Sequence, residues 1–294
     1  MANEKLIKFI ETGIEAYGLR RQLGPMSQVV TRSTGGGMGD IIKSTVNILL
    51  EQGADLHFIP SIFGLLEDKY SIRNGLSHEE YVKFIYSKHD KNIDLVTSKH
   101  FDDLTKPYQN IEQTIAAFND LARPIVKEMH RASDQRSIVH GHDQFTGPLA
   151  AYCSARGIPS LHHFHNFYTN LVHQDLFGHW NFSGNRERSK AINEKIFWDK
   201  TPGVIESHAT AIKNASLIIS VGERVLEEML AGRFYTQGDT QDPNNIFTNS
   251  QNAINEMNIK YRSGQVRVVP NPISPDDLPE NQPYLAATYS QHTH

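Results

Sequence analysis

The sequence predicts an α/β fold, with a Rossmann-like parallel sheet and helices on both faces. Two observations lead to this prediction. From residue 27 onward, short β-like runs alternate with helical patterns, which is the order expected of strand–helix–strand units. Glycine-rich and histidine-rich segments follow several of the runs, where the loops at the carboxyl edge of such a sheet bind ligands.

The elements are predicted from periodicity in chain order. Apolar residues at helical spacing before Gly24-Pro25 predict an N-terminal amphipathic helical arm over 1–24. The β-like runs are 27–32, 55–60, 92–97, 137–141, 159–164, 216–221 and 266–270. The helical patterns are 40–52, 78–87, 109–131, 145–156, 186–213, 223–231 and 250–258.

The end of the chain loses this alternation. Residues 232–250 are polar and rich in turn-forming types, so we expect a surface loop there. Prolines without periodicity over 276–294 predict a tail or linker. The sequence therefore predicts one main domain over 25–275, between the arm and the tail.

Composition narrows the class of protein. A net charge of −4 over 294 residues argues against nucleic acid or a membrane surface as the main partner. No run is long enough for a membrane span, and the first residues lack the pattern of a signal peptide. A single cysteine, Cys153, sits among small apolar residues and is expected to be buried in a cytoplasmic protein.

The glycine-rich segment 34–40 is the first candidate for a ligand site. It lies between a β-like run and a helical pattern, so backbone N–H groups and the helix dipole would point at an anion. Gly36, Gly37 and Gly39 leave no Cβ between the main chain and a phosphate or sugar. Asp40 is placed to cap the helix or to accept a ligand hydroxyl. The segment matches neither the P-loop nor the dinucleotide fingerprint, and the alternative is an ordinary tight turn.

Histidines mark the ends of two later strands. His140 and His142 share one face by the period of two, and Asp143 follows at the end of that strand. In the next strand His163 and His165 share a face in the same way, while His162 and His163 are also candidates for core or surface positions.

These histidines and the aspartate are residue types that bind zinc. The sequence has no His-Glu-x-x-His segment and no cysteine pair, and the facing of the two strands is unknown. We therefore expect no metal. His165 is the stronger candidate for a functional histidine, because Asn166 and an aromatic residue follow it at the strand end.

Five segments, in order, resemble motifs of the N-terminal domain of bacterial glycogen and starch synthases, which are GT-B retaining glycosyltransferases. Thr34-Gly35-Gly36-Gly37-Met38-Gly39-Asp40 is similar to the family's Lys-Thr-Gly-Gly-Leu-Gly-Asp loop. His140-Gly141-His142-Asp143-Gln144 resembles its His-Ala-His-Asp-Trp segment, and His165-Asn166 matches its His-Asn strand end. Residues 215–221 and 262–273 resemble the family's later strand and the Pro-Asn-Gly-Ile-Asp stretch that closes the domain.

The resemblance implies a function and site residues. Family members transfer glucose from ADP-glucose or UDP-glucose to an α-1,4-glucan, with retention of configuration and without a metal or other cofactor. By this resemblance His165 would contact the transferred glucose, and Asp143 would hold sugar hydroxyls or the acceptor. The remaining substrate-binding residues would be Gly36, Gly37, Gly39, Asp40, His142 and Asn166.

The sequence also departs from the family. Thr34 replaces the loop lysine, Gln144 replaces the tryptophan and Pro272 replaces a glycine. The C-terminal domain that binds the donor nucleotide is absent, so we expect a partner chain or a longer protein to supply it. The alternatives are a non-catalytic glucan-binding or regulatory protein, and a hydrolase using Asp143 and His165, for which no Gly-x-Ser-x-Gly nucleophile motif occurs.

Overall fold

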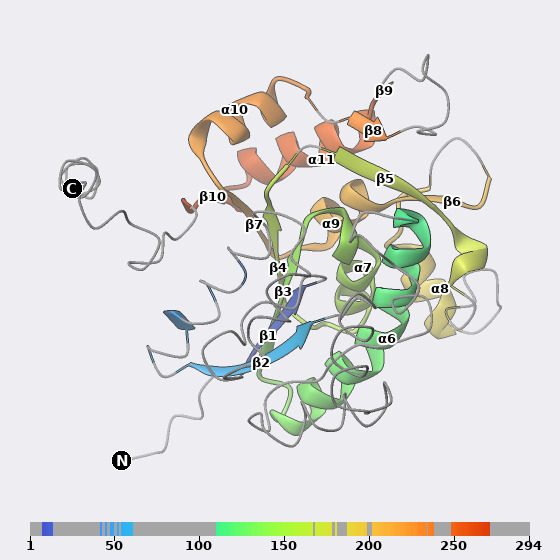
Figure 1. Ribbon diagram of the computed structural model, residues 1–294, viewed down its shortest axis with the longest axis vertical. Helices are drawn as coiled ribbons and strands as arrows, with labels where there is room; N and C mark the ends of the chain where they lie inside the picture. The colour runs from blue at the N-terminus through green and yellow to red at the C-terminus, as the bar shows by residue number, and fades with distance from the viewer. Residues whose placement is uncertain are drawn as a thin grey trace, which may run out of the picture.

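The computed structural model describes residues 8–13, 42, 45, 48, 49, 52, 54–60, 110–166, 168–177, 180, 187–198, 202–233, 235–237 and 248–270. Within these residues the centre of the fold is a six-stranded, wholly parallel sheet in the order β10-β7-β4-β3-β1-β2 (Figure 1). Its strands are β1 (Lys8–Gly13), β2 (Asp55–Pro60), β3 (Ser137–His142), β4 (Ser160–Phe164), β7 (Leu217–Ser220) and β10 (Val266–Val268).

The strand order reverses between β1 and β3. β2 pairs with one side of β1, whereas β3 pairs with the other side, and β4, β7 and β10 continue in that second direction. In open parallel sheets this reversal is where ligands bind, at the carboxyl ends of the strands. The hydroxyl of Thr12, near the end of β1, donates to the backbone carbonyl of His140 in β3 at 2.7 Å, which joins the two strands at this point.

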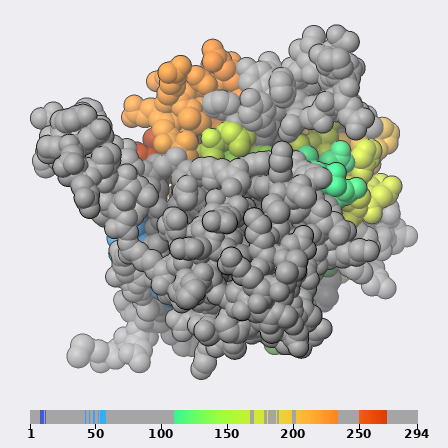
Figure 2. Space-filling model, in the orientation of Figure 1, coloured from blue at the N-terminus to red at the C-terminus, as the bar shows by residue number. Residues whose placement is uncertain are grey.

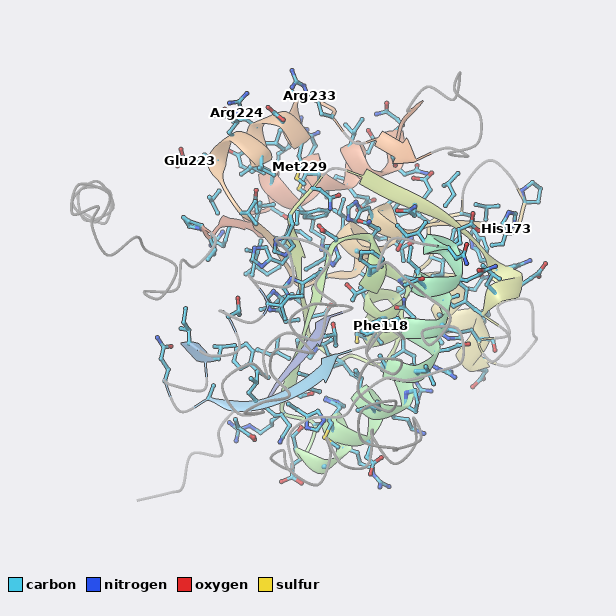
Figure 3. The ribbon with its side chains drawn as sticks, in the orientation of Figure 1. Phe118, His173, Glu223, Arg224, Met229 and Arg233 are labelled. Carbon is cyan, nitrogen blue, oxygen red and sulfur yellow. The ribbon has the colours of Figure 1, made fainter. Side chains whose placement is uncertain are left out.

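Helices flank the sheet and enclose two apolar cores. Figure 1 shows α6 (Ile111–Ala132), α7 (Gly147–Ala155) and α9 (Ser207–Asn214) grouped beside it. Phe118 of α6, labelled in Figure 3, lies fully buried in the larger core with Phe145. The smaller core gathers residues of β7, α9, α10 (Glu223–Leu230) and α11 (Gln251–Arg262). The exposed side of α10 reaches the surface at the top of Figure 2.

A second, four-stranded sheet lies among the described residues, in the order β6-β5-β8-β9. Its strands are β5 (Tyr168–His173), β6 (Val204–Glu206), β8 (Tyr235–Gln237) and β9 (Thr248–Asn249). β5 contacts α6, α9 and the short helix η3 (Asp143–Thr146) that follows β3. The small sheet therefore packs next to the carboxyl edge of the large one. The segment between β5 and β6 holds η4 (Gln174–Leu176) and α8 (Glu187–Asn193).

The predicted N-terminal helical arm is wrong over residues 8–13, which form β1. Ile10 and Thr12 are both fully buried in this strand, and Lys8 forms an ion pair with Asp55 of β2 at 3.0 Å. The helical spacing of apolar residues is a local pattern, whereas β1 gains hydrogen bonds and burial from two neighbouring strands. Tertiary pairing of this kind overrides a local helical preference.

Most predicted elements that fall on described residues are confirmed. The runs 55–60, 137–141, 159–164, 216–221 and 266–270 are strands, and 109–131, 145–156, 223–231 and 250–258 are helical apart from small shifts at their ends. Helical backbone at Ile42, Thr45, Ile48 and Leu49 agrees with the helix predicted over 40–52. The runs 27–32 and 92–97, the helix 78–87, the glycine segment 34–40 and the tail 276–294 lie outside the described residues.

Two further predictions need correction. Residues 186–213 form α8, β6 and α9 instead of one helix. The interruption is explained by Pro202-Gly203, since Gly203 has φ of +75°, which breaks a helix. The segment predicted as a surface loop, 232–250, contains the two short strands β8 and β9.

The structure also bears on the predictions for Cys153 and for membrane-spanning helices. Cys153 is buried, as predicted, and burial raises the pKa of its thiol to about 12. Such a thiol carries little thiolate at neutral pH and is a poor nucleophile. Among the described helices, none combines the length and the apolar content that crossing a bilayer would require.

Candidate functional site

The two histidine-bearing strands end side by side next to the reversal point of the sheet. β3 and β4 pair in parallel, with Gly141 opposite His162 and His142 opposite His163. This register determines how the histidines of one strand face those of the other, which the sequence alone does not.

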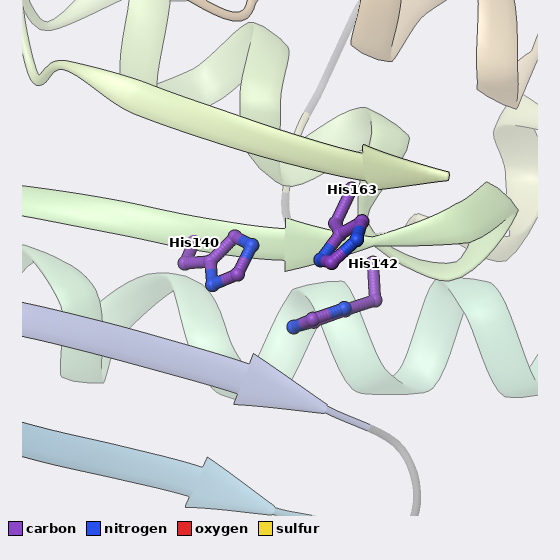
Figure 4. Close-up of side chains that lie close together, drawn as sticks. All are labelled: His140, His142 and His163. Atoms are coloured by element: carbon purple, nitrogen blue, oxygen red, sulfur yellow. The ribbon is translucent and has the colours of Figure 1, made fainter. Parts of the chain in front are cut away.

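Four imidazoles gather on one face of these strand ends. The ring centroids of His140 and His142 lie 4.4 Å apart, and those of His163 and His165 lie 4.5 Å apart, which confirms the faces predicted from the period of two. The two pairs also face each other, because the His163 ring lies 5.5 Å from both His140 and His142. Figure 4 shows the rings of His140, His142 and His163 gathered at the ends of the strands.

His142 and His165 are directly connected. The Nδ1 of His142 and the Nε2 of His165 lie 2.9 Å apart, so one ring donates a hydrogen bond to the other. Burial lowers the pKa of His142 well below its ordinary value, and the nearby His140 and His165 lower it further. His142 is therefore a neutral imidazole at neutral pH and takes part in hydrogen bonding without a positive charge.

His162 points to the opposite face of β4 and belongs to a different environment. Its ring meets the rings of Phe164 and His208 edge-on, at centroid distances of 4.8 and 5.9 Å. Burial lowers the pKa of His208 to about 3, and that of His162 is also well below its ordinary value, chiefly through burial. His162 is thus a core histidine, one of the two roles considered for it, while His163 belongs to the cluster at the strand ends.

Asp143 holds the end of β4. One carboxylate oxygen accepts the backbone N–H of His165 at 2.7 Å, and the other accepts the side-chain amide of Asn166 at 2.7 Å. Asp143 is almost fully buried and has φ of +46°, a left-handed conformation that Asp tolerates better than most residues. Its carboxylate therefore positions His165 and Asn166, in addition to any contact with a ligand.

Close packing fixes the segment that carries Asp143. The side-chain amide of Asn119 in α6 donates to the Phe145 carbonyl, and its oxygen accepts the Leu149 N–H. A Cβ on Gly141 would lie 2.4 Å from the Thr146 hydroxyl oxygen, so this position in β3 accommodates only glycine without rearrangement. These contacts anchor η3 against α6 and hold the strand ends rigidly.

The structure brings together half of the site residues predicted from sequence. His142, Asp143, His165 and Asn166 converge at the ends of β3 and β4. The other four, Gly36, Gly37, Gly39 and Asp40, lie outside the described residues.

Sequence reasoning missed two contributions to this site. Thr12 of β1 falls in the segment for which the sequence predicts a helical arm, and its hydrogen bond to His140 has no local sequence signal. For His163 the sequence leaves a core or a surface position as alternatives, although its period of two with His165 is the signal that points to the cluster.

Comparisons with known proteins identify a matching family and a similar fold. The family model described as the starch synthase catalytic domain matches residues 27–241. Among solved structures, the fold is similar to the catalytic domain of starch synthase IV from Arabidopsis thaliana bound to ADP and acarbose, with a TM-score of 0.54 and 13% sequence identity. That similarity covers 92% of this chain and 52% of the other, so the chain spans about half the length of this relative. No curated protein sequence matched the chain.

Proposed function

The chain belongs to the starch synthase catalytic-domain family, and we propose that it is the acceptor-side half of a glycosyltransferase. The proposed reaction transfers glucose from a nucleotide-sugar, ADP-glucose or UDP-glucose, to an α-1,4-glucan with retention of configuration. On this proposal the parallel sheet, with helices on both faces, is the N-terminal half of a GT-B fold. Since β1 (Lys8–Gly13) belongs to this sheet, the domain predicted over 25–275 extends toward the N-terminus to include β1.

One observation carries the proposal. His142, Asp143, His165 and Asn166 converge at the carboxyl ends of β3 and β4, next to the point where the strand order reverses. Sugars are bound by several polar groups held in fixed positions, and this cluster offers imidazole and amide groups on rigid strand ends.

Each residue has a proposed role. His165, which is only partly buried, would donate or accept a hydrogen bond at a hydroxyl of the transferred glucose. His142 would orient His165 through the 2.9 Å contact between their rings. Asp143 would hold His165 and Asn166 in place, and Asn166 would contribute to the sugar site. The glycine segment with Gly36, Gly37, Gly39 and Asp40 would contact the diphosphate or sugar.

Transfer would also require a donor-binding domain. A diphosphate leaving group needs charges that stabilise it and a closed site that excludes water. In this proposal a second domain, in the same protein or another chain, provides both, and the relative's bound ADP and acarbose suggest nucleotide and glucan-like ligands for the assembled site.

The test is a calorimetric titration of the chain with maltooligosaccharides, acarbose, ADP-glucose and UDP-glucose. We expect glucan binding that His165→Ala weakens about fivefold, since one hydrogen bond to a ligand is worth about 1 kcal/mol. His173→Ala is the matched control, because His173 is an exposed residue at the end of β5 that lies apart from the cluster (Figure 3).

The outcomes separate the candidate functions. Glucan binding with transfer, once a donor-binding domain is added, would support the glycosyltransferase. Glucan binding without transfer in that reconstitution would favour a non-catalytic glucan-binding or regulatory protein. Absence of binding by the folded chain to every sugar and nucleotide-sugar would overturn the proposal.

A further inference from the structure

We propose that His140, His142 and His163 form a binding site for one divalent transition-metal ion of the zinc class. Each residue offers a ring nitrogen, and the three nitrogens lie within 4.8 Å of one another. The rings come from two adjacent strands and face a common point, as Figure 4 shows. This inference goes beyond the proposed glycosyl transfer and does not depend on it.

The donor set determines which metals suit the site. Imidazole binds Zn²⁺, Cu²⁺, Ni²⁺ and Co²⁺ well, whereas Mg²⁺ and Ca²⁺ prefer oxygen ligands. The carboxylate of Asp143, the residue after His142, accepts hydrogen bonds from His165 and Asn166 and stabilises the end of β4. Three imidazoles therefore form the ligand set. Three protein ligands leave a fourth tetrahedral position for water or a ligand oxygen.

The surroundings of His142 support metal binding. Histidine ligands usually donate a hydrogen bond from the ring nitrogen that does not face the metal, which fixes the tautomer and orients the ring. When the His142 Nδ1–H donates to His165 Nε2 across their 2.9 Å contact, the Nε2 of His142 carries the lone pair that a metal requires. His165 thus has the position of an outer partner that orients a ligand.

The backbone positions of the ligands are rigid. His140 and His142 belong to β3, which is hydrogen-bonded between β1 and β4, and His163 lies opposite His142 in register. The Thr12 hydroxyl also donates to the His140 carbonyl and connects β1 to this region. The three side chains are 5%, 1% and 4% exposed, so little water competes at the site.

A small adjustment would complete the geometry. Zinc–nitrogen bonds of about 2.0–2.1 Å place tetrahedral ligand nitrogens about 3.3 Å apart. The observed limit of 4.8 Å means that the ligand nitrogens must approach by up to about 1.5 Å, which rotation of the imidazole rings about χ2 can supply. The sequence predicts no metal, because it has no His-Glu-x-x-His segment and no cysteine pair and does not determine the facing of the two strands. The register of β3 and β4 provides that facing.

The test uses the full chain, stripped of metal with a chelator and titrated without sugar or nucleotide. Zn²⁺ binding is followed by calorimetry and Co²⁺ binding by its visible absorption, which is intense in tetrahedral sites. We expect one ion per chain, and a loss of affinity of about a hundredfold or more in His163→Ala, since even outer partners contribute 10- to 100-fold. Zn²⁺ should also raise the melting temperature of the wild type.

Two controls make the test decisive. His173→Ala removes an exposed imidazole on β5 and should leave the affinity unchanged. His140→Gln removes a second ligand with a residue that remains polar, in case His163→Ala fails to fold. The proposal is overturned if the folded wild type binds no Zn²⁺ or Co²⁺ at micromolar concentrations, or if folded His140→Gln binds them as the wild type does. Because no sugar is present, either result leaves the glucan-binding proposal standing.

Discussion

The backbone N–H of His165 donates to the carboxylate of Asp143 at 2.7 Å, so the residue after β3 fixes the residue after β4. Asp143→Ala should therefore lower the free energy of unfolding by about 2–3 kcal/mol, because it removes buried hydrogen bonds to a charged group. It should also lower glucan affinity as strongly as His165→Ala does. Chemical denaturation and calorimetry measure the two effects.

Asp143→Asn is the matched variant for this prediction. Asn also tolerates the left-handed backbone at φ of +46° and keeps one acceptor oxygen for the His165 N–H. Its NH2 group replaces the oxygen that accepts the Asn166 amide, and it keeps this contact when the Asn166 amide flips to present its own oxygen, so the charge is lost while both contacts are retained. We expect about half of the destabilisation seen with alanine, since hydrogen bonds to neutral groups are worth about half as much. Equal stability of Asp143→Ala and the wild type would show that the carboxylate does not hold β4.

Because α7 and α9 are in close contact, a single methyl group added at Gly147 should strongly lower the free energy of unfolding. A Cβ on Gly147 would lie 2.1 Å from the backbone oxygen of Ser207, and the Ser207 hydroxyl donates to the nearby Gln144 carbonyl. Gly147→Ala should destabilise the fold by about 2–3 kcal/mol, because both clashing groups belong to packed helices. Thermal or urea unfolding measures this difference.

Gly222→Ala is the control for Gly147→Ala. Gly222 has φ of −176°, and an added Cβ would meet nothing within 4 Å. Its substitution should change the free energy of unfolding by less than about 0.5 kcal/mol. Similar losses in both variants would contradict the packing argument and indicate a general intolerance of side chains at the starts of these helices.

Acid should destabilise the protein through His208. Its pKa is about 3 in the folded chain because of burial, against about 6.5 when unfolded, so the unfolded state takes up the proton first as pH falls. Stability from this group is complete above pH 6.5 and decreases toward pH 3, by about 1.4 kcal/mol per pH unit. At pH 5 the loss is about 2 kcal/mol relative to pH 7.

Unfolding curves collected between pH 7 and pH 5 test this linkage. His208→Phe, which places an aromatic ring beside Phe164, should reduce the pH dependence by about one proton. His173→Ala should leave it unchanged, because His173 is exposed. An unchanged slope in His208→Phe would mean that other groups account for the acid sensitivity.

Deletion of residues 1–24 distinguishes a central strand from a peripheral arm. The deletion removes β1, which pairs with β2 on one side and β3 on the other. We expect loss of cooperative unfolding and of near-ultraviolet circular dichroism. A milder variant, Ile10→Ala, should cost about 2–5 kcal/mol because Ile10 is fully buried. A truncated chain that still unfolds cooperatively would contradict the position of β1.

The sequence predicted the elements whose signal is local. The strands β3 and β4 are short apolar runs with turn-forming residues beside them, and α6 is a long amphipathic pattern, so their positions were correct. The period of two also gave the correct pairs of histidines, because side chains in a strand alternate strictly between faces.

The remaining features depend on contacts between distant segments. β1 resembles part of an amphipathic helix until its two partner strands are known, and the strands β6 and β9 have only 3 and 2 residues. The facing of His142 toward His163 follows from the register of β3 and β4, which no single run of residues determines. The structural role of Asp143 likewise required the position of the His165 N–H.

The central position of β1 has a consequence for biosynthesis. Thr12 and its hydrogen-bond acceptor His140 are 128 positions apart in the chain. At about 5–20 residues per second, a ribosome needs about 6–25 s between making the two. During that interval β3 has not yet been synthesised, so Phe9 and Ile10 lack that partner strand. This apolar segment therefore stays accessible to chaperones. Translation speed and chaperone supply should therefore affect the yield of folded protein more strongly than in a domain whose sheet is assembled from consecutive strands.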